Sequence, residues 1–422
     1  MKTSVVAIAL IVVASSANSQ PFEFDWDMTL SGSSAQHRHS KLLGSPDSAS
    51  TEGIDAVVDV QFEGYGVTGL LAAKGSQIYS SDATQSYQGE LIAQELFWQG
   101  NMELFSQPVD LTIGKVRLDW GVGYGYRPLD LFKPYRRNPV GIQVEEGTGT
   151  AMASYFNSAG EWSLYYTDSS WTKQRSSDLE QASEQQGVGI RRYVLSGDTE
   201  WQMLAYYDDI RHGLLGGSLV TVVDEAWSLH GSAVYQNHYL GYRQNEQNSP
   251  VTLEEYNDGY QALLGLNWAN ATGHNVIVEY WFDSRSWSNS DWQEAYRRVE
   301  LLNSDAMLAP LTSSYAQGLN HANLVQHNLM IHWSKNSTAW SHWPWTRQLL
   351  WLDKLTPTFD LLYSPQDQGV IATQWIEYQM YDSGSASLFA EIAARFMTGN
   401  QDSLYANLPD KRMIFLNLRG KF

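Results

Sequence analysis

The chain contains no cysteine, which excludes a disulfide framework and a thiolate metal site. A cysteine-free chain also suits a protein that must cross an oxidising compartment before it folds. Basic residues are scarce: 27 Lys and Arg against 46 Asp and Glu give a formal net charge of −19, which argues against a nucleic acid as partner. Beyond the N-terminal residues there is no run of eighteen apolar residues, which argues against a helical membrane protein.

Residues 1–19 have the pattern of a secretory signal peptide. A short positive segment with Lys2 precedes an apolar run at 5–13, and Ala17 and Ser19 are placed for cleavage after residue 19. No Pro/Gly/Ser-rich linker or change of composition divides the remainder. The sequence therefore predicts a signal peptide at 1–19 and a single domain at 20–422.

Apolar and polar residues alternate along this domain, as in Phe22, Phe24, Trp26 and Met28 with acidic residues between them. Period two indicates strands with one apolar and one polar face. In the strand where Ala56, Val58, Val60 and Phe62 alternate with polar residues, one apolar residue, Val57, stands on the polar face. The mean hydropathy of −0.36 is what such alternation averages to. Strands are predicted near 22–32, 54–64, 66–78, 86–98, 108–120, 148–156, 160–168, 186–196, 198–208, 212–222, 226–236, 258–269, 274–284, 322–334, 354–364, 368–381, 385–396 and 411–422.

The connections between these strands are alternately short and long. The long ones are 33–53, 121–147, 169–185, 237–257, 285–321 and 397–410, whereas 99–107 and 335–353 interrupt the rule because they are not tight turns. Short turns that alternate with long loops are typical of bacterial membrane barrels. The fold class predicted is all-β: a transmembrane antiparallel up-and-down β-barrel of about 18 strands, within a range of 16–18.

The aromatic residues form two groups at the strand ends. Tryptophans fall at the ends with short turns (Trp98, Trp162, Trp201, Trp227, Trp268 and Trp333), and tyrosines near the other ends (Tyr207, Tyr235, Tyr260, Tyr280 and Tyr363). Amphipathic rings prefer the two membrane interfaces, whereas a soluble β-sandwich would not sort them by strand end. The predicted location is the cell outer membrane.

The last strand, Met413–Phe422, alternates and stops on an aromatic residue. It resembles the closing strand of Gram-negative outer-membrane β-barrels. The resemblance implies that Phe422, Leu418 and Leu416 form a membrane insertion signal read by the barrel-assembly machinery, with outer-membrane lipid around the barrel. Because closure puts the last strand beside the first, Arg419 and Lys421 are expected to lie against Glu23 and Asp25.

Segment 114–132 resembles porin-like and alginate-export-like barrels. In these, a Gly-Lys strand ends in Trp-Gly and an aromatic-rich loop follows; the matching residues are Gly114, Lys115, Trp120, Gly121, Gly123, Tyr124, Pro128 and Asp130. We expect loop 121–147 to fold into the pore; the alternative is an ordinary external loop. The candidate pore-lining residues are Lys115, Arg117, Asp119, Arg136, Arg137, Asp55, Asp59, Glu279, Glu377 and Arg395.

Two further connections have features of their own. The long external loop 285–321 is expected to contain a short helix at 295–302 and either to cap the mouth or to decorate the surface. Connection 335–353 contains Trp340, Trp343, Trp345 and Trp351, which favours an interfacial anchor.

These features predict a porin-like outer-membrane channel for passive diffusion or export of small polar solutes. The alternative is a structural or adhesive surface protein whose loops plug the lumen. No enzyme is predicted, since His332 and Ser334 have a lipase-like spacing without a surrounding motif. No cofactor is expected, and His37 and His39 are too weak a pattern for a metal site.

Overall fold

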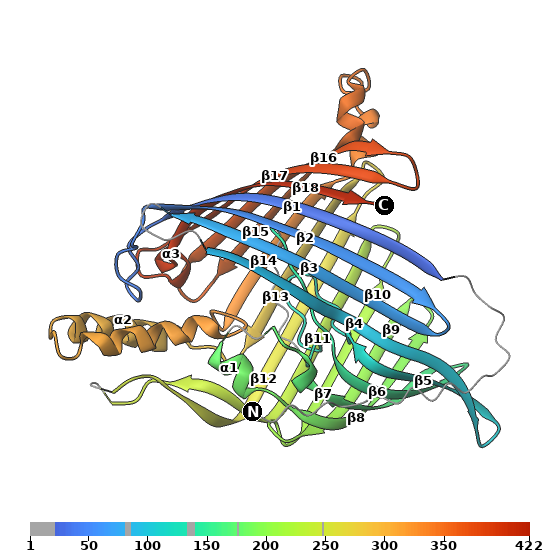
Figure 1. Cartoon of the computed structure of the whole chain (residues 1–422), viewed down its shortest axis with the longest axis horizontal. Helices are drawn as coiled ribbons and strands as arrows, with labels where there is room; N and C mark the ends of the chain where they lie inside the picture. The colour runs from blue at the N-terminus through green and yellow to red at the C-terminus, as the bar shows by residue number, and fades with distance from the viewer. Residues whose placement is uncertain (1–21, 81–85, 133–139, 175–176, 247–248) are drawn as a thin grey trace.

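The computed structural model describes residues 22–80, 86–132, 140–174, 177–246 and 249–422. Within these ranges, eighteen strands form one closed antiparallel sheet (Figure 1). Each strand pairs with its neighbours in sequence, and β1 also pairs with β18, so the sheet has no free edge. The predicted all-β, up-and-down barrel of about 18 strands is confirmed. No helix in the described part of the chain is long and apolar enough to cross a membrane.

The strands are β1 (Glu23–His37), β2 (Ser50–Gly64), β3 (Val67–Ser80), β4 (Ser86–Leu104), β5 (Gln107–Val116), β6 (Thr148–Asn157), β7 (Gly160–Asp168), β8 (Gln186–Ser196), β9 (Thr199–Asp208), β10 (Leu214–Val222), β11 (Trp227–Arg243), β12 (Thr252–Ala269), β13 (His274–Asp283), β14 (His327–Lys335), β15 (Leu355–Ser364), β16 (Gly369–Asp382), β17 (Ser387–Gly399) and β18 (Asp410–Lys421). The α-helices are α1 (Asp178–Ala182), α2 (Asn289–Asn303) and α3 (Leu404–Asn407). Short 3₁₀ helices are η1 (Ser169–Trp171), η2 (Ala309–Asn320), η3 (Ser337–His342) and η4 (Leu350–Lys354).

The two faces of the wall differ as the alternation requires. On β12, Leu264 points outward and is 68% exposed, whereas Gln261 points inward and is 6% exposed. Other outward residues that are exposed include Leu91, Leu164 and Met203. Apolar side chains exposed all round a barrel are satisfied by hydrocarbon rather than by water.

The barrel closes where the last residue meets the first strand. The Phe422 N–H donates to the Trp26 carbonyl at 3.0 Å, and the Trp26 N–H donates back at 3.2 Å. Their rings stack with centroids 4.4 Å apart. The predicted neighbours of Arg419 and Lys421 are wrong, because the register sets Lys421 opposite Asp27 and Arg419 opposite Thr29.

Several strand ends differ from the predicted ones. β4 continues to Leu104 and joins β5 through Phe105 and Ser106, both with positive φ (53° and 61°), so segment 99–107 is a tight hairpin after all. β11 and β12 extend into segment 237–257, which the sequence predicts as a loop, because Tyr242 on β11 and Val251 directly before β12 join the apolar cluster of α2.

Two other predicted strands are too long. β5 ends at Val116 rather than at residue 120, because the chain then turns away from the wall. β14 begins at His327 rather than at 322, since Val325 is packed in the cluster beneath α2.

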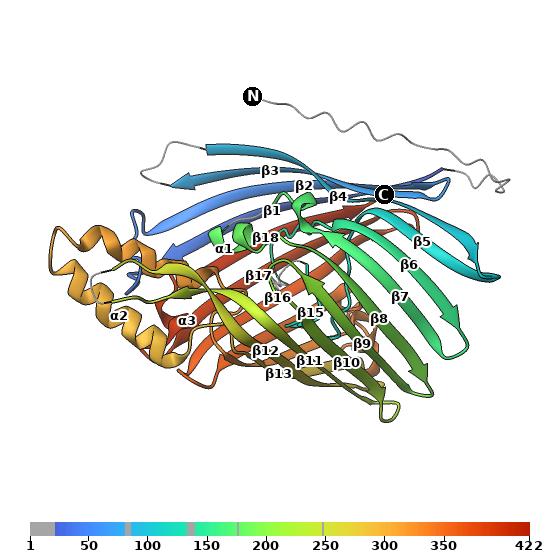
Figure 2. The ribbon, with the colours of Figure 1, turned by 90° about the horizontal axis from the view of Figure 1, so that it is seen from below.

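The connections sort to the two ends of the barrel. One end, here called the loop end, carries α2 and α3, whereas the C-terminus lies at the other, the turn end (Figures 1 and 2). Helix α2 begins at a capping box of Ser288 and Asp291, earlier than the predicted helix. Its buried face, including Trp292 and Val299, forms an apolar cluster with Leu42 and Tyr405 from other loop-end segments. The long loops thus pack into one layer over the strands.

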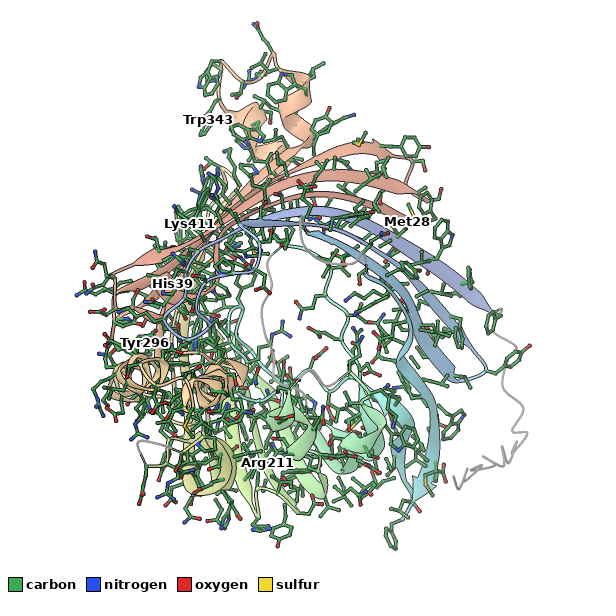
Figure 3. The ribbon with its side chains drawn as sticks, turned by 60° about the vertical axis from the view of Figure 1, so that its left-hand side comes forward. Met28, His39, Arg211, Tyr296, Trp343 and Lys411 are labelled. Carbon is green, nitrogen blue, oxygen red and sulfur yellow. The ribbon has the colours of Figure 1, made fainter. Side chains whose placement is uncertain are left out.

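The β14–β15 connection projects from the turn end, where Figure 3 labels Trp343. Lys335, at the end of β14, lies over the Trp343 ring at 4.0 Å and over the Trp340 ring at 5.1 Å. Trp343 stacks on Trp345, which is exposed. Lys335 therefore holds Trp340 and Trp343 at the end of β14, and Trp345 presents an apolar surface outward.

Candidate functional site

Two described parts of the segment between β5 and β6, 117–132 and 140–147, lie inside the ring of strands, and the segment is called the inward loop from here on (Figure 3). Arg136 and Arg137, predicted to line the pore, lie outside the described residues. The contacts of the two described parts with the wall define the candidate site.

A buried carboxylate on β13 holds the first part of the loop. Glu279 accepts the backbone N–H of Tyr124 at 2.6 Å on one oxygen and that of Gly125 at 2.7 Å on the other. His230 Nε2 on β11 lies 2.8 Å from the same carboxylate, which has no exposed surface. A Cβ at Gly125 would lie 2.5 Å from the Met330 sulfur and 3.2 Å from a Glu279 oxygen, so the glycine lets the backbone approach Glu279 without displacing Met330. Hydrogen bonds to a charged acceptor are the stronger kind, so this contact fixes the loop position.

A second anchor follows at Tyr126. Its hydroxyl donates to Asp283 at 2.9 Å and accepts from Gln261 Nε2 at 2.5 Å. Asp283 is held in turn by Arg285, whose Nε and Nη2 donate to its two oxygens at 2.9 and 2.8 Å. The paired carboxylate raises the pKa of Arg285 above its ordinary value, although burial opposes the effect. The loop is therefore tied to a fully paired polar group at the end of β13.

An apolar contact completes this side. Leu129 is fully buried in a cluster with Tyr165, Leu204 and Val234 from the inner faces of three strands. Trp120 packs edge-on against Tyr165 at 4.9 Å, and its carbonyl accepts from Gln202. The inward apolar residues on β7, β9 and β11 are thus buried against the inward loop.

The second part of the loop contacts the other side of the barrel. Val140 is buried with Ala393 of β17 and Phe415 of β18. Ile142 and Val144 pack on the cluster of Val57, Ala72 and Ile92 from β2, β3 and β4. Because 120–132 lies on β7–β14 and 140–147 on β17, β18 and β2–β4, the described parts of the loop meet walls on both sides of the lumen.

Ion pairs fix both ends of the loop. Lys115 Nζ lies 2.5 Å from Glu146, whose other oxygen accepts the N–H groups of Lys173 and Gln174. Arg117 pairs with Glu95 on β4 at 3.3 Å, and its N–H donates to the same carboxylate. Lys115 and Glu279 are thus buried beneath or beside the loop rather than facing open water.

Inside the loop, Asp130 closes a small turn. Its carboxylate accepts the Gly121 N–H at 2.8 Å and lies 3.7 Å from Arg127. Burial raises the pKa of Asp130 to about 6, although the Gly121 N–H and Arg127 both lower it. This carboxylate therefore titrates close to neutral pH.

The other predicted residues are spread over the wall. Asp55 and Asp59 are half-buried on β2, and Asp59 accepts from Gln94 at 2.5 Å. Glu377 pairs with Arg419 at 2.6 Å, and Arg395 donates to Thr373 at 3.2 Å. Asp119 is exposed on the inward loop.

Sequence reasoning missed the partners of the loop, namely Glu95, Glu146, His230 and Tyr126. Glu279 and Tyr124 are 155 residues apart in the chain, and no local motif marks such a pair. Between the inward loop and the loop end lies a pocket of about 170 Å³. Arg127, Arg211 and Arg285 line it together with aromatic rings, so its wall is both polar and apolar.

Comparisons with known proteins fit this geometry. No protein-family model and no curated protein sequence matches the chain. Among solved structures, OccAB1 of Acinetobacter baumannii is similar with a TM-score of 0.53 at 10% identity, covering 95% of this chain and 96% of that one. OccK8 (OprE) of Pseudomonas aeruginosa gives 0.51 at 10% identity, covering 95% and 98%. A BenF-like porin from Pseudomonas fluorescens Pf-5 gives 0.50 at 9% identity, covering 95% and 98%. At such identities the likeness concerns the fold, which is the barrel of these proteins.

Proposed function

We propose that this chain is an outer-membrane channel through which small polar solutes diffuse passively. The observation that carries the proposal is the inward loop, anchored on both sides of a closed 18-strand barrel. A barrel of this size is too wide for side chains alone to fill, and water occupies what the loop leaves free. A fixed loop inside such a barrel narrows the path and thereby selects solutes by size and charge.

The membrane orientation follows from the two ends. The turn end, where Phe422 joins β1, faces the periplasm, and the layer formed by α2 and the other long loops faces outward. Lipid surrounds the exposed apolar face, and the barrel-assembly machinery inserts the chain by its last strand. The tryptophan group at 337–354 rests in the periplasmic interface as an anchor.

The walls on either side of the loop suggest how charge acts on the solute. β1 and β2 present Asp25, Asp27, Asp55 and Asp59 to the lumen, whereas the pocket at the loop end is lined by Arg127, Arg211 and Arg285, each of them paired with an aspartate. A polar solute that enters from the loop end meets these ion pairs before the acidic wall. Alginate export, the other half of the sequence resemblance, gains no support from this arrangement, and no catalytic role is proposed.

Conductance in planar bilayers tests the proposal. Heat-modifiable, folded protein should give stepwise currents, and liposomes that contain it should swell in small sugars but not in large ones. Protein denatured by boiling is the negative control for both measurements. Folded protein that gives neither steps nor swelling would favour the alternative, a surface protein whose loops plug its lumen.

A further inference from the structure

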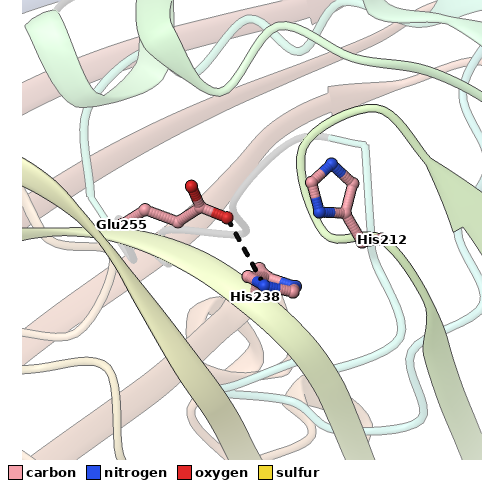
Figure 4. A group of neighbouring side chains, drawn as sticks. All are labelled: His212, His238 and Glu255. Carbon is pink, nitrogen blue, oxygen red and sulfur yellow. Dashed lines mark ion pairs between the residues drawn. The ribbon is translucent and has the colours of Figure 1, made fainter.

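Two histidines and a glutamate meet at the loop end of the barrel, away from the lumen contacts described above. His212 lies in the turn between β9 and β10, His238 on the outer part of β11, and Glu255 on the outer part of β12. One ligand atom from each lies within 4.8 Å of the other two. Figure 4 shows the three side chains, His212 from the turn and the other two from neighbouring strands.

The backbone fixes this convergence. The His238 N–H donates to the Arg211 carbonyl at 3.0 Å, and the Asn237 N–H donates to the Gly213 carbonyl at 2.9 Å. These bonds hold the turn that carries His212 beside β11, and the two imidazole rings meet edge to face at 4.8 Å. Leu240 on β11 pairs with Glu255 on β12, which sets the carboxylate diagonally across from His238. All three residues are therefore positioned by ladder or turn hydrogen bonds, and only their side chains need to move.

The contacts among the three are too loose to explain the cluster by themselves. His238 Nε2 lies 3.6 Å from Glu255, and this exposed pair contributes at most about 1 kcal/mol. Nδ1 of His238 is buried and has no hydrogen-bond partner in the described part of the chain. The nearest arginine side chain in the turn, Arg211, is directed to the lumen, where it pairs with Asp208 at 2.7 Å and donates to the Leu131 carbonyl. The Arg211 guanidinium is therefore engaged away from the cluster.

We propose that His212, His238 and Glu255 bind a divalent transition-metal ion, with Zn²⁺ as the expected occupant. Two imidazoles and one carboxylate are a set of ligands that zinc takes, with a water molecule from the exposed side as the fourth. Tetrahedral coordination places ligand atoms about 3.3 Å apart, so the side chains must close by roughly 1.5 Å at most. Glu255 and His212 are exposed and can rotate to do so.

Such an ion would join the β9–β10 turn to the β11–β12 hairpin. The same turn carries Arg211, which holds the inward loop at Leu131. Metal binding would therefore stiffen the rim at the point where the inward loop is attached to it. The inference concerns the outer rim and does not depend on whether the barrel conducts solutes.

The test uses the tag-free, refolded barrel in detergent, titrated with Co²⁺ and followed by its visible absorption, with Zn²⁺ as competitor. We expect one ion per chain, and binding weaker by at least about tenfold in His238→Ala and in His212→Ala. Glu255→Gln, which keeps the side-chain volume, should also weaken binding. His39→Ala removes an exposed loop histidine outside the cluster and should leave the affinity unchanged.

Each result decides the question. Absence of stoichiometric binding by the wild-type chain overturns the site, as does wild-type affinity in all three cluster variants. Weakening by His39→Ala of the same size would mean that scattered surface histidines bind the ion. Heat-modifiability on gels establishes that each variant is folded, and Glu255→Gln preserves the test if a histidine variant fails to fold.

Discussion

Glu279 is the residue through which the inward loop can be released without altering the loop itself. Its carboxylate accepts two backbone N–H groups of the loop, from Tyr124 and Gly125, one on each oxygen. Each hydrogen bond to a charged acceptor contributes roughly 1.5–3 kcal/mol. In Glu279→Gln one oxygen becomes an NH₂ group that faces an N–H donor, so at least one of these bonds is lost. Glu279→Ala loses both, roughly 3–6 kcal/mol of docking free energy.

These values predict distinct current traces. A loss of about 2 kcal/mol raises the undocked population of segment 122–126 by roughly 30-fold. Glu279→Gln should therefore show frequent brief excursions to higher conductance in planar bilayers, and Glu279→Ala a higher mean conductance. The remaining anchors at Tyr126 and Leu129 should keep the rest of the loop in place.

A matched control separates loop release from simple loss of charge. Glu377→Gln removes the same charge from β16, where the carboxylate pairs with Arg419. If Glu279→Gln and Glu377→Gln give the same traces, or if Glu279→Ala conducts like the wild type, the loop is not held by Glu279 and our reasoning about the constriction fails.

Three other predictions concern the lipid face, assembly and pH. Leu264→Arg should destabilise the inserted barrel by about 2–4 kcal/mol in urea unfolding from lipid, and Gln61→Arg on the lumen face by much less; equal costs would mean that the faces are reversed. Phe422→Ser removes the Trp26 stack and the proposed insertion signal, so pulse-chase fractionation should find less heat-modifiable protein in the outer membrane; normal levels would refute the signal. Because the pKa of Asp130 is raised to about 6, protonation favours the folded loop below that pH, and this contribution is lost as pH rises through 6. Asp130→Asn should flatten the dependence of thermal stability on pH between about 4 and 7, and an unchanged profile would assign it to another group.

The strands were predictable from sequence because each depends on a local rule. Alternation with period two gave all eighteen, and the errors lie at their ends, where contacts between distant segments decide. β11 and β12 run beyond their predicted ends because Tyr242, on β11, and Val251, directly before β12, pack in the same apolar cluster as α2. The hairpin at Phe105 and Ser106 was missed because positive φ is usually signalled by Gly or Asn.

The contacts of the inward loop were harder to predict from the sequence. Which wall residues hold it depends on the curvature and register of the closed barrel, which no stretch of sequence contains. Glu279 and Lys115 could be recognised as charges on a polar face, but their burial could not, because the covering residues come from elsewhere in the chain. For the same reason His212, His238 and Glu255 carry no recognisable metal-binding spacing.

One irregularity in the sequence did mark the loop. Val57 breaks the polar face of β2, and on an open lumen wall an apolar side chain would face water. In the structure it is 4% exposed, packed with Ala72 and Ile92 where Ile142 and Val144 of the inward loop lie against them. Leu204 and Val234, also inward, meet Leu129 in the same way on the other side. Apolar residues on the polar face of a barrel strand therefore indicate where a loop covers the wall. Taken over several strands together, such apolar residues mark the path of the loop through the lumen.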